Sequence, residues 1–363
     1  MKLTEITSLV TDYVANGSFK SLRDNAYYVT KDKGFARVIR LTDYNNSYDD
    51  SDTVWVDEKG YKFLSKSSLL PNDILISNVG AYLGTVFYAP NLTVPMTLGP
   101  NAILVRPNEK VMNAYLYYLL SSSYGYSKLM AIKSGSAMPK FNKTDLKAID
   151  LNIHPLSEQH YIVDILGSID NSIENNEAKI TKIEELALLK IRTNNNSKIL
   201  KPYIKFIKGK KPLESGTSLD DYLSIEGITS ANYQKAYSDN MILANPFDIL
   251  MVMDGASSGT VYSHQKGIVS STLAKIEVPQ NVNDYLYWFL LSMKDIIKTR
   301  NTGSAIPHAN KDYIENLSFD YTLATNKNLT TELHDLRLKI IDIKRNNAKL
   351  KELKSLYLKK FFD

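Results

Sequence analysis

The sequence contains one literal catalytic motif, Gly255-Ala-Ser-Ser-Gly259, which satisfies the G-x-S-x-G pattern of serine hydrolases. In such enzymes the central serine attacks a carbonyl carbon while a histidine takes up the serine proton. Ser257 would be the nucleophile here, and the candidate bases downstream are His264, His308 and His334. The motif should lead into a helix, yet Thr260-Val-Tyr262 continues as a strand-like run, which argues against a hydrolase.

Other signatures of catalysis are incomplete. Asn245-Pro-Phe247 resembles the Asn-Pro-Pro-aromatic loop of amino methyltransferases but lacks the second proline, and Gly209-Lys-Lys211 lacks the spacing of a phosphate-binding loop. There are no cysteines, which excludes disulfides and cysteine zinc sites. The histidines lie far apart without metal-ligand spacing, and we interpret each as a surface or satisfied core residue: His154, His160, His264, His308 and His334. The sequence therefore predicts no catalytic site, metal or cofactor in this chain.

Internal repetition is the strongest feature of the sequence. Four collinear pairs of segments match at an offset of roughly 170 residues: 73–86 with 248–261, 113–117 with 283–287, 135–143 with 303–311, and 178–186 with 348–356. The first copy keeps both glycines of the G-x-S-x-G motif, but it has Tyr82 where the second copy has Ser257. Shared glycines around a variable residue are typical of a structural turn. The chain is therefore predicted to be a tandem duplication of one domain plus one helix.

Within each copy the residue pattern predicts a small, mainly β domain with one short helix. Apolar runs bounded by turn residues are expected as strands at 54–56, 74–77, 85–88 and 102–105, and again at 249–253, 260–262 and 273–278. The short helix is expected at 113–122 and at 283–293. The paired glycines fall between two strands, where they permit positive φ in a turn.

Each copy ends in a longer segment with helical periodicity, expected to be capped by Ser157 in the first copy and by Thr330 or Thr331 in the second. The seam positions are Ile162, Leu166, Ile169, Ile173, Asn176, Ile180 and Ile183, then Leu336, Ile340, Ile343, Asn346 (or Asn347), Leu350 and Leu353. Because a whole domain separates them, we expect an antiparallel coiled coil within the chain, with pairing between chains as the alternative. A helix of about 33 residues would span on the order of 50 Å and hold the two domains apart.

The predicted fold class is α+β, with two tandem mainly-β domains separated by two long helices. More than one domain is expected, because 363 residues exceed the usual size of a single hydrophobic core. The expected boundaries are 1–155 for the first domain, 156–197 for the first helical region, 198–327 for the second domain and 328–363 for the second helical region. The 44% hydrophobic and 23% charged content fits a globular protein, and the net charge of +5 permits a polyanionic partner. The first residues show no signal peptide and no run approaches the roughly 20 apolar residues of a membrane span, so we expect a cytoplasmic protein with no membrane partner.

Matched loops in the two copies are rich in lysine, arginine, asparagine and serine, the groups that hold phosphates on a duplex. A solvated turn is the alternative interpretation. The candidate DNA-binding residues are Asn78, Tyr82, Lys133, Ser134, Ser136, Lys140, Asn142 and Lys143 in the first copy, and Ser257, Ser258, Lys266, Arg300, Asn301, Ser304, His308, Asn310 and Lys311 in the second. Two similar but unequal domains would read the two halves of a bipartite site.

These features together resemble the specificity subunits of Type I restriction-modification enzymes over essentially the full chain. The resemblance is carried by Asp73-Ile-Leu with its trailing glycines, by the Gly-Ser-Ala-x-Pro loops at Gly135 and Gly303, and most specifically by Ile153-His-Pro-Leu-Ser-Glu-Gln159 running into a helix. The second copy departs from the pattern, because residues 323–329 lack the Pro-x-x-Glu-Gln entry and leave the start of the second helix less defined.

The resemblance implies a non-catalytic subunit with two target-recognition domains, each of which reads half of a bipartite double-stranded DNA target. It also implies two methyltransferase subunits that bind S-adenosylmethionine and restriction (motor-nuclease) subunits that use ATP and Mg²⁺, with no cofactor in this chain. Three alternatives stay open: a methyltransferase-only system, which neighbouring genes would reveal; a hydrolase, whose ester cleavage Ser257→Ala would abolish; and a purely structural coiled-coil protein without DNA affinity.

Overall fold

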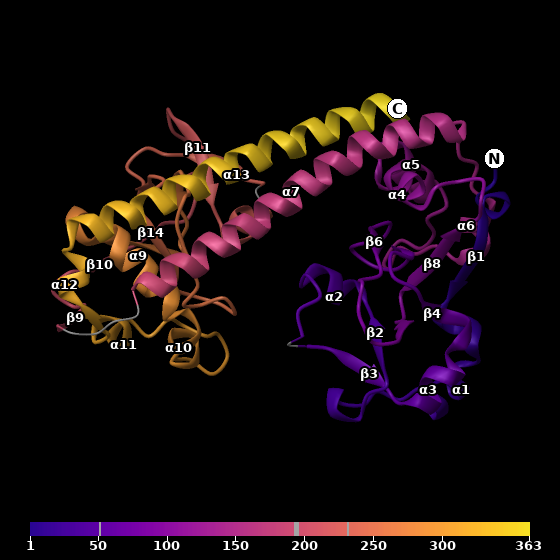
Figure 1. Ribbon diagram of the computed structural model, residues 1–363, viewed down its shortest axis with the longest axis horizontal. Coiled ribbons are helices and arrows are strands. Elements are labelled where there is room, and N and C mark those ends of the chain that lie inside the picture. Colours follow the sequence, from indigo (N-terminus) through magenta and orange to yellow (C-terminus); the bar gives the residue numbers. More distant parts are fainter. Residues whose placement is uncertain (51, 192–195, 231) are drawn as a thin grey trace. The chain divides into compact units, whose positions relative to one another are not determined.

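A computed structural model describes residues 1–50, 52–191, 196–230 and 232–363, which form two compact units (Figure 1). Unit 1 comprises Met1–Ser172 and Leu350–Asp363, and unit 2 comprises Ile173–Lys349. The two long helices, α7 (Leu156–Lys190) and α13 (Lys327–Phe362), each contribute one part to each unit. Residues 192–195, which belong to the segment expected as the first helical region, lie outside the described residues.

In its described part, unit 1 is built on two four-stranded sheets. One sheet has the order β1-β8-β5-β6 with antiparallel neighbours, and the other has the order β3-β2-β7-β4, in which β2 and β7 are parallel. The strands are β1 (Thr7–Asp12), β2 (Ala36–Ile39), β3 (Val54–Val56), β4 (Ser68–Leu69), β5 (Ile74–Ser77), β6 (Val86–Tyr88), β7 (Met96–Leu98) and β8 (Ala102–Pro107). Strand β5 is buried on both faces, which explains its apolar run Ile74–Ile76.

Alternation along β5 connects two hydrophobic clusters of unit 1. Ile74 and Ile76 join Tyr115 in one cluster, whereas Leu75 joins a second cluster on the other face of the strand. The helices of unit 1 are α1 (Phe19–Asn25), α2 (Leu41–Asn45), α3 (Glu58–Phe63), α4 (Asn113–Ser121), α5 (Ser123–Ala131) and α6 (Lys143–Ala148), with 3-10 turns at Leu3–Glu5, Tyr13–Asn16, Lys31–Lys33 and Ser65–Ser67.

Unit 2 repeats this plan. Its described residues form sheets with the orders β10-β17-β14-β15 and β12-β11-β16-β13, and β18 pairs with β9. Its strands are β9 (Ser197–Ile199), β10 (Lys205–Lys208), β11 (Leu219–Leu223), β12 (Gln234–Tyr237), β13 (Leu243–Ala244), β14 (Ile249–Val252), β15 (Val261–Tyr262), β16 (Gly267–Val269), β17 (Leu273–Glu277) and β18 (Ser318–Asp320). Strand β14 alternates like β5, since Ile249 and Met251 face one cluster and Leu250 and Val252 face another.

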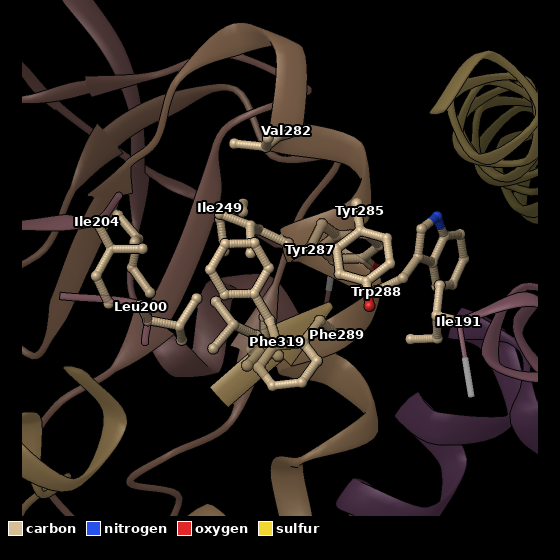
Figure 2. Packing of buried hydrophobic residues seen from close by; sticks show 14 of the residues in the cluster. Ile191, Leu200, Ile204, Ile249, Val282, Tyr285, Tyr287, Trp288, Phe289 and Phe319 are labelled. Atoms are coloured by element: carbon tan, nitrogen blue, oxygen red, sulfur yellow. The ribbon is translucent and has the colours of Figure 1, made fainter. Parts of the chain in front are cut away.

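The larger core of unit 2 combines aliphatic side chains with a group of aromatic ones (Figure 2). Trp288 of α9 is fully buried and donates its indole N–H to the Leu333 carbonyl of α13 at 3.3 Å, which fixes the helix against the domain. The remaining helices are α8 (Ile225–Ser230), α9 (Asn283–Ser292), α10 (Lys294–Thr299), α11 (Lys311–Glu315) and α12 (Tyr321–Ala324), with a 3-10 turn at Gln280–Val282. None of the helices in the described part of the chain has both the length and the apolar character needed to cross a bilayer.

The predicted α+β fold with two tandem domains and long helices is confirmed, and the expected strand runs correspond to β3, β5, β6, β8, β14, β15 and β17. The expectation of one short helix per copy was wrong, because unit 1 alone contains the short helices α1 to α6. Each unit also has a second four-stranded sheet, in which several strands carry polar residues. In β2, for example, Arg37 is buried because its guanidinium is hydrogen bonded to the Tyr48 carbonyl at 3.0 Å and paired with Asp50 at 3.1 Å.

In both units α7 and α13 pack antiparallel. In unit 1, Asp170 of α7 pairs with Lys354 of α13 at 2.6 Å. In unit 2, Asn176 donates its amide N–H to Asn347 Oδ1 at 2.8 Å, and both asparagines are buried. Within unit 1, Tyr161 further back on α7 contacts Phe361, and within unit 2, Lys190 further along α7 pairs with Glu332 at 2.6 Å. In each unit the α13 number therefore falls as the α7 number rises, so the two helices run in opposite directions.

Of the two asparagines predicted for the seam, Asn347 occupies it and Asn346 is exposed. Two other details of the helix predictions were wrong. Leu353 keeps 41% of its surface exposed, so it is no core seam residue. Helix α7 already begins at Leu156, and α13 begins at Lys327, where Asn326 Oδ1 accepts the Leu329 N–H at 3.1 Å; the predicted caps at Ser157, Thr330 and Thr331 lie inside the helices.

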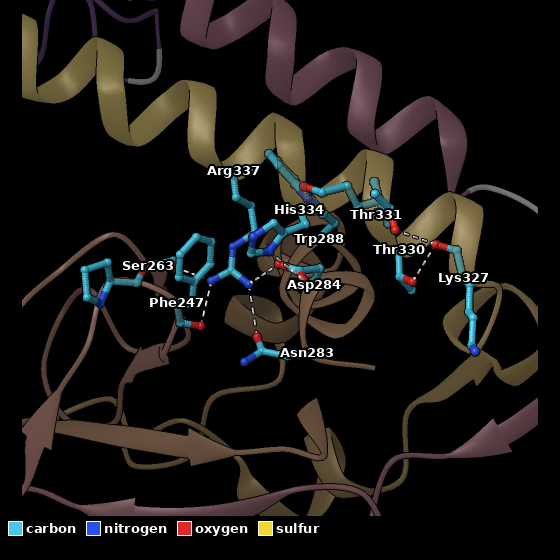
Figure 3. Close-up of polar contacts among 12 residues, drawn as sticks. Phe247, Ser263, Asn283, Asp284, Trp288, Lys327, Thr330, Thr331, His334 and Arg337 are labelled. Atoms are coloured by element: carbon cyan, nitrogen blue, oxygen red, sulfur yellow. Dashed lines mark hydrogen bonds and ion pairs between the residues drawn. The ribbon is translucent and has the colours of Figure 1, made fainter. Parts of the chain in front are cut away.

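Helix α13 is anchored to unit 2 by a buried cation, Arg337 (Figure 3). Its guanidinium donates to Asp284 Oδ1 at 2.8 Å, to Asn283 Oδ1 at 3.0 Å and to the Phe247 carbonyl at 2.7 Å. The ring of Tyr287 lies 4.4 Å from the guanidinium carbon. Each of these groups belongs to the domain, so Arg337 fixes the register of α13 against it.

Candidate nucleic-acid interface

In unit 1 the turn 78–84 and the loop 133–143 form one surface, which we call loop pair 1. The loop closes on itself, because the Ser134 and Lys140 backbones exchange N–H to carbonyl hydrogen bonds at 2.8 and 2.9 Å. It is tied to the turn by the Gly80 N–H, which donates to the Pro139 carbonyl at 2.9 Å, and by the Phe141 N–H, which donates to the Asn78 carbonyl at 3.2 Å.

Unit 2 builds loop pair 2 from the turn 253–259 and the loop 300–311 with matching hydrogen bonds. The Thr302 and His308 backbones exchange hydrogen bonds at 2.9 and 2.7 Å. The Gly255 N–H donates to the Pro307 carbonyl at 2.9 Å, and the Ala309 N–H donates to the Met253 carbonyl at 2.8 Å. The sequence repeat is therefore a repeat of this constellation.

The shared glycines are required by backbone conformation. Gly80 and Gly84 have φ of 86° and 82°, and their counterparts Gly255 and Gly259 have φ of 103° and 87°. This left-handed region strains residues that carry a Cβ. The glycine spacing that suggested a nucleophile motif is explained by the turn.

The structure places Ser257 in this turn, between the antiparallel strands β14 and β15. A nucleophile elbow instead leads from a strand into a helix. In the described residues Ser257 Oγ makes no hydrogen bond to His308, whose Nδ1 lies 2.7 Å from Asp254 Oδ1. The other two candidate bases are also unsuited to this role. His334 pairs with Asp284 at 3.1 Å. His264 is a poor base, because burial together with the charges of Lys344 and Arg337 lowers its pKa to about 3.

His264 also corrects the expectation that every histidine is a surface or satisfied core residue. Both of its ring nitrogens are buried, and within the described part of the chain neither has a hydrogen-bond partner. No group of three or more histidine, aspartate or glutamate side chains that could hold a metal ion occurs among the described residues.

Many predicted DNA-binding residues reach solvent on the loop pairs. The exposed ones are Tyr82, Lys133, Ser134, Ser136, Lys140 and Asn142 in unit 1, and Arg300, Ser304, His308 and Lys311 in unit 2, while Lys143, Ser257, Asn301 and Asn310 are half-buried. Lys266 is exposed but lies before β16 in the other sheet, outside loop pair 2.

Several of these side chains have structural partners. Asn142 Oδ1 caps α6 by accepting the Asp145 N–H at 2.9 Å, and Asn310 Oδ1 caps α11 by accepting the Tyr313 N–H at 3.0 Å. The Ser258 hydroxyl is buried and donates to the Pro307 carbonyl at 2.8 Å. The amides of Asn78 and Asn301 donate to the carbonyls of Phe141 and Ser258 at 3.1 and 3.0 Å. These five residues therefore shape the loop pairs.

Charge on the loop pairs is partly organised by acidic residues. Lys143 pairs with Asp12 at 2.9 Å. Asp254 pairs with Lys208 at 2.8 Å and with His308 at 2.7 Å. Burial alone would raise the pKa of Asp254, but these two partners outweigh burial and lower the pKa. Sequence reasoning missed Lys208, because it lies outside the matched segments.

Sequence reasoning also missed the tip residues Met138 and Ile306. They are 66% and 58% exposed at matched positions of the two loops. The signal was present in the Gly-Ser-Ala-x-Pro repeat, in which an apolar residue precedes the proline in both copies.

Comparison with known proteins points to one family. Residues 17–185 match the Type I restriction modification DNA specificity domain. The Type I restriction enzyme MjaVIII specificity subunit of Methanocaldococcus jannaschii is 31% identical over 169 residues, which are 44% of this chain and 40% of that protein. The EcoKI specificity subunit of Escherichia coli is 21% identical over 181 residues, 49% of this chain and 38% of that protein. The matches thus span less than half the length of these relatives.

Among solved structures, the S subunit of a Type I restriction-modification system from M. genitalium is similar with a TM-score of 0.52 at 14% identity. The alignment covers 100% of this chain and 95% of that one. At this identity the similarity shows a shared fold.

Proposed function

We propose that this chain, whose residues 17–185 belong to the Type I restriction modification DNA specificity family, is the DNA-recognition subunit of a Type I restriction-modification system. Each unit would read one half of a bipartite double-stranded target through its loop pair. The proposal assigns methylation to two partner methyltransferase subunits that bind S-adenosylmethionine, and cleavage to restriction subunits that use ATP and Mg²⁺. This chain would supply sequence recognition without catalysis or a cofactor of its own.

The observation that carries the proposal is a constant scaffold with variable exposed residues. The backbone hydrogen bonds of the two loop pairs match, but Tyr82 stands where the other copy has Ser257, and Lys140 stands where the other has His308. A fixed backbone sets the register on phosphates, while different side chains read different base edges. Two such surfaces in one chain suit two unequal half-sites.

The experiment is single-molecule sequencing of N6-methyladenine in a methylation-free host that expresses this chain with its methyltransferase. We expect a new bipartite motif that disappears without this chain. Replacing residues 1–155 with those of a related subunit should change one half only, and replacing 198–327 should change the other. Tyr115 and His154 should be kept in the first exchange, because they contact Phe362 of α13.

Two results would count against this function. One is the absence of any motif although the methyltransferase is shown to be active on another substrate. The other is a motif that persists unchanged when both segments are replaced, since recognition would then belong to the methyltransferase.

A further inference from the structure

The tips of the two loop pairs present large apolar side chains to solvent. Met138 and Ile306 occupy the same position in the repeat, directly before Pro139 and Pro307, and are 66% and 58% exposed. A single exposed apolar residue needs no explanation. Here a large exposed apolar side chain recurs in both copies, whereas Tyr82 and Lys140 are replaced by Ser257 and His308 in the second copy.

The loops hold these tips rigidly. Reciprocal backbone hydrogen bonds close each loop just below its tip, between Ser134 and Lys140 and between Thr302 and His308. The glycine that starts each loop has φ of 83° at Gly135 and 89° at Gly303. A Cβ there would lie 2.9 Å from the Met138 carbonyl oxygen or 2.4 Å from that of Ile306, so the tight loop depends on glycine.

The surroundings of the tips favour a polyanion as the partner. In unit 1 the tip is flanked by exposed Ser136 and Lys140, with Lys133 at the base of the loop. In unit 2 exposed Ser304 and His308 occupy the positions of Ser136 and Lys140, and His308 is paired with Asp254. Asn301 stands where the first copy has Lys133, and the exposed cation Arg300 is its neighbour. Cations and hydroxyls around an apolar tip fit phosphates on either side of a groove better than they fit an apolar protein surface.

We propose that Met138 and Ile306 are wedges that insert between base pairs of bound duplex DNA, one in each half-site. This rests on the proposed recognition function and adds the mode of contact. Proteins that deform DNA insert Phe, Leu, Ile, Met or Pro side chains into a base step and partly unstack it, while cations hold the flanking phosphates. A rigid tip suits this role because the loop loses little conformational entropy on insertion.

The test uses the complex of this chain with its methyltransferase and duplexes that contain the methylated motif. 2-Aminopurine, which fluoresces when unstacked, replaces one base at a time in both half-sites, except at the methylated adenine. We expect a fluorescence increase at one step in each half. Met138→Ala should abolish the increase in one half and Ile306→Ala in the other, and each should weaken motif binding by roughly tenfold.

Matched controls are Leu70→Ala in unit 1 and Leu219→Ala in unit 2, which remove apolar side chains that are 56% and 58% exposed and belong to neither loop pair. Both controls should leave fluorescence and affinity unchanged. The wedge is refuted if the wild-type complex binds the motif without unstacking any step, or if the tip variants impair assembly with the methyltransferase instead of DNA binding. Failure of the recognition function itself looks different, because the wild-type complex would then bind motif and scrambled duplexes equally.

Discussion

At the residue scale, Arg337 is a buried cation whose partners all lie on the domain beneath α13. Arg337→Met should lower the free energy of unfolding of unit 2 by about 3–5 kcal/mol, because Asp284 would keep a partly buried charge without its main partner. Denaturant unfolding measures the loss. Arg345→Met is the matched control on the same helix: its ion pair with Asp342 is exposed, and its removal should cost less than about 1 kcal/mol. Equal losses for the two variants would contradict the anchoring role.

His264 should make unit 2 sensitive to mild acid. Burial first, then the charges of Lys344 and Arg337, lower its pKa to about 3 from the ordinary 6.5. Between pH 6.5 and pH 3 the unfolded state therefore binds a proton at His264 that the folded state does not bind. The free energy of unfolding keeps its whole value above pH 6.5 and decreases as the pH falls towards 3. From pH 7 to pH 5 the loss is expected to be about 2 kcal/mol.

The matched variant for this prediction is His264→Asn, since His264 has φ of 65° and asparagine tolerates that conformation. Denaturant unfolding of the variant between pH 5 and 7 should show little of the slope. A slope as steep as in the wild type would mean that other groups cause the acid sensitivity.

At the scale of elements, the buried amide pair between α7 and α13 sets which residues face each other. Asn347→Leu should destabilise unit 2 by about 1–3 kcal/mol, because Asn176 would be left buried without its partner. Asn346→Leu changes the neighbouring exposed residue and should be nearly neutral. Thermal unfolding of both variants distinguishes them, and a larger effect at Asn346 would place the seam one residue earlier.

The same two residues show how far the sequence predicts the elements. A helical repeat of 3.6 residues drifts against a seven-residue pattern, so periodicity brings either Asn346 or Asn347 to the seam, and only the partner helix decides. Apolar runs such as β14 could be predicted because alternate residues face different clusters. Strand β2 could not be predicted in this way, because it contains Arg37, a charged residue that is typical of the surface. Arg37 is buried only because Asp50 and the Tyr48 carbonyl bind its guanidinium.

The position of the candidate site could be predicted from the sequence, but the roles of its side chains could not. The repeat located both loop pairs, because glycines with positive φ recur at fixed spacing. It could not separate exposed from structural side chains: Asn78 and Ser258 donate to Phe141 and Pro307, which lie 63 and 49 residues further along the chain. Contacts at such separations leave no local signal.

At the scale of the whole molecule, the C-terminal end of α13 packs inside unit 1 against residues that lie far from it in the sequence. Phe362 at the end of α13 is buried, and its ring lies 5.6 Å from that of Tyr115 and 6.1 Å from that of His154. Asp363 accepts the Tyr124 N–H at 3.1 Å. Unit 1 therefore requires the last turns of α13, which the chain supplies only after unit 2.

This arrangement predicts a long-distance effect of Phe362→Ala. Removing the ring leaves a cavity against α4 and should cost unit 1 about 3–5 kcal/mol. Hydrogen exchange of the full chain should then show faster exchange in α4, while α9 in unit 2 keeps its protection, since local opening follows the unit that lost the contact. Leu356→Ala, on the same helix but 60% exposed, is the control and should leave both helices protected. Unchanged protection of α4 in Phe362→Ala would mean that unit 1 holds its core without α13, and that recognition by unit 1 could be exchanged between chains without regard to their last helix.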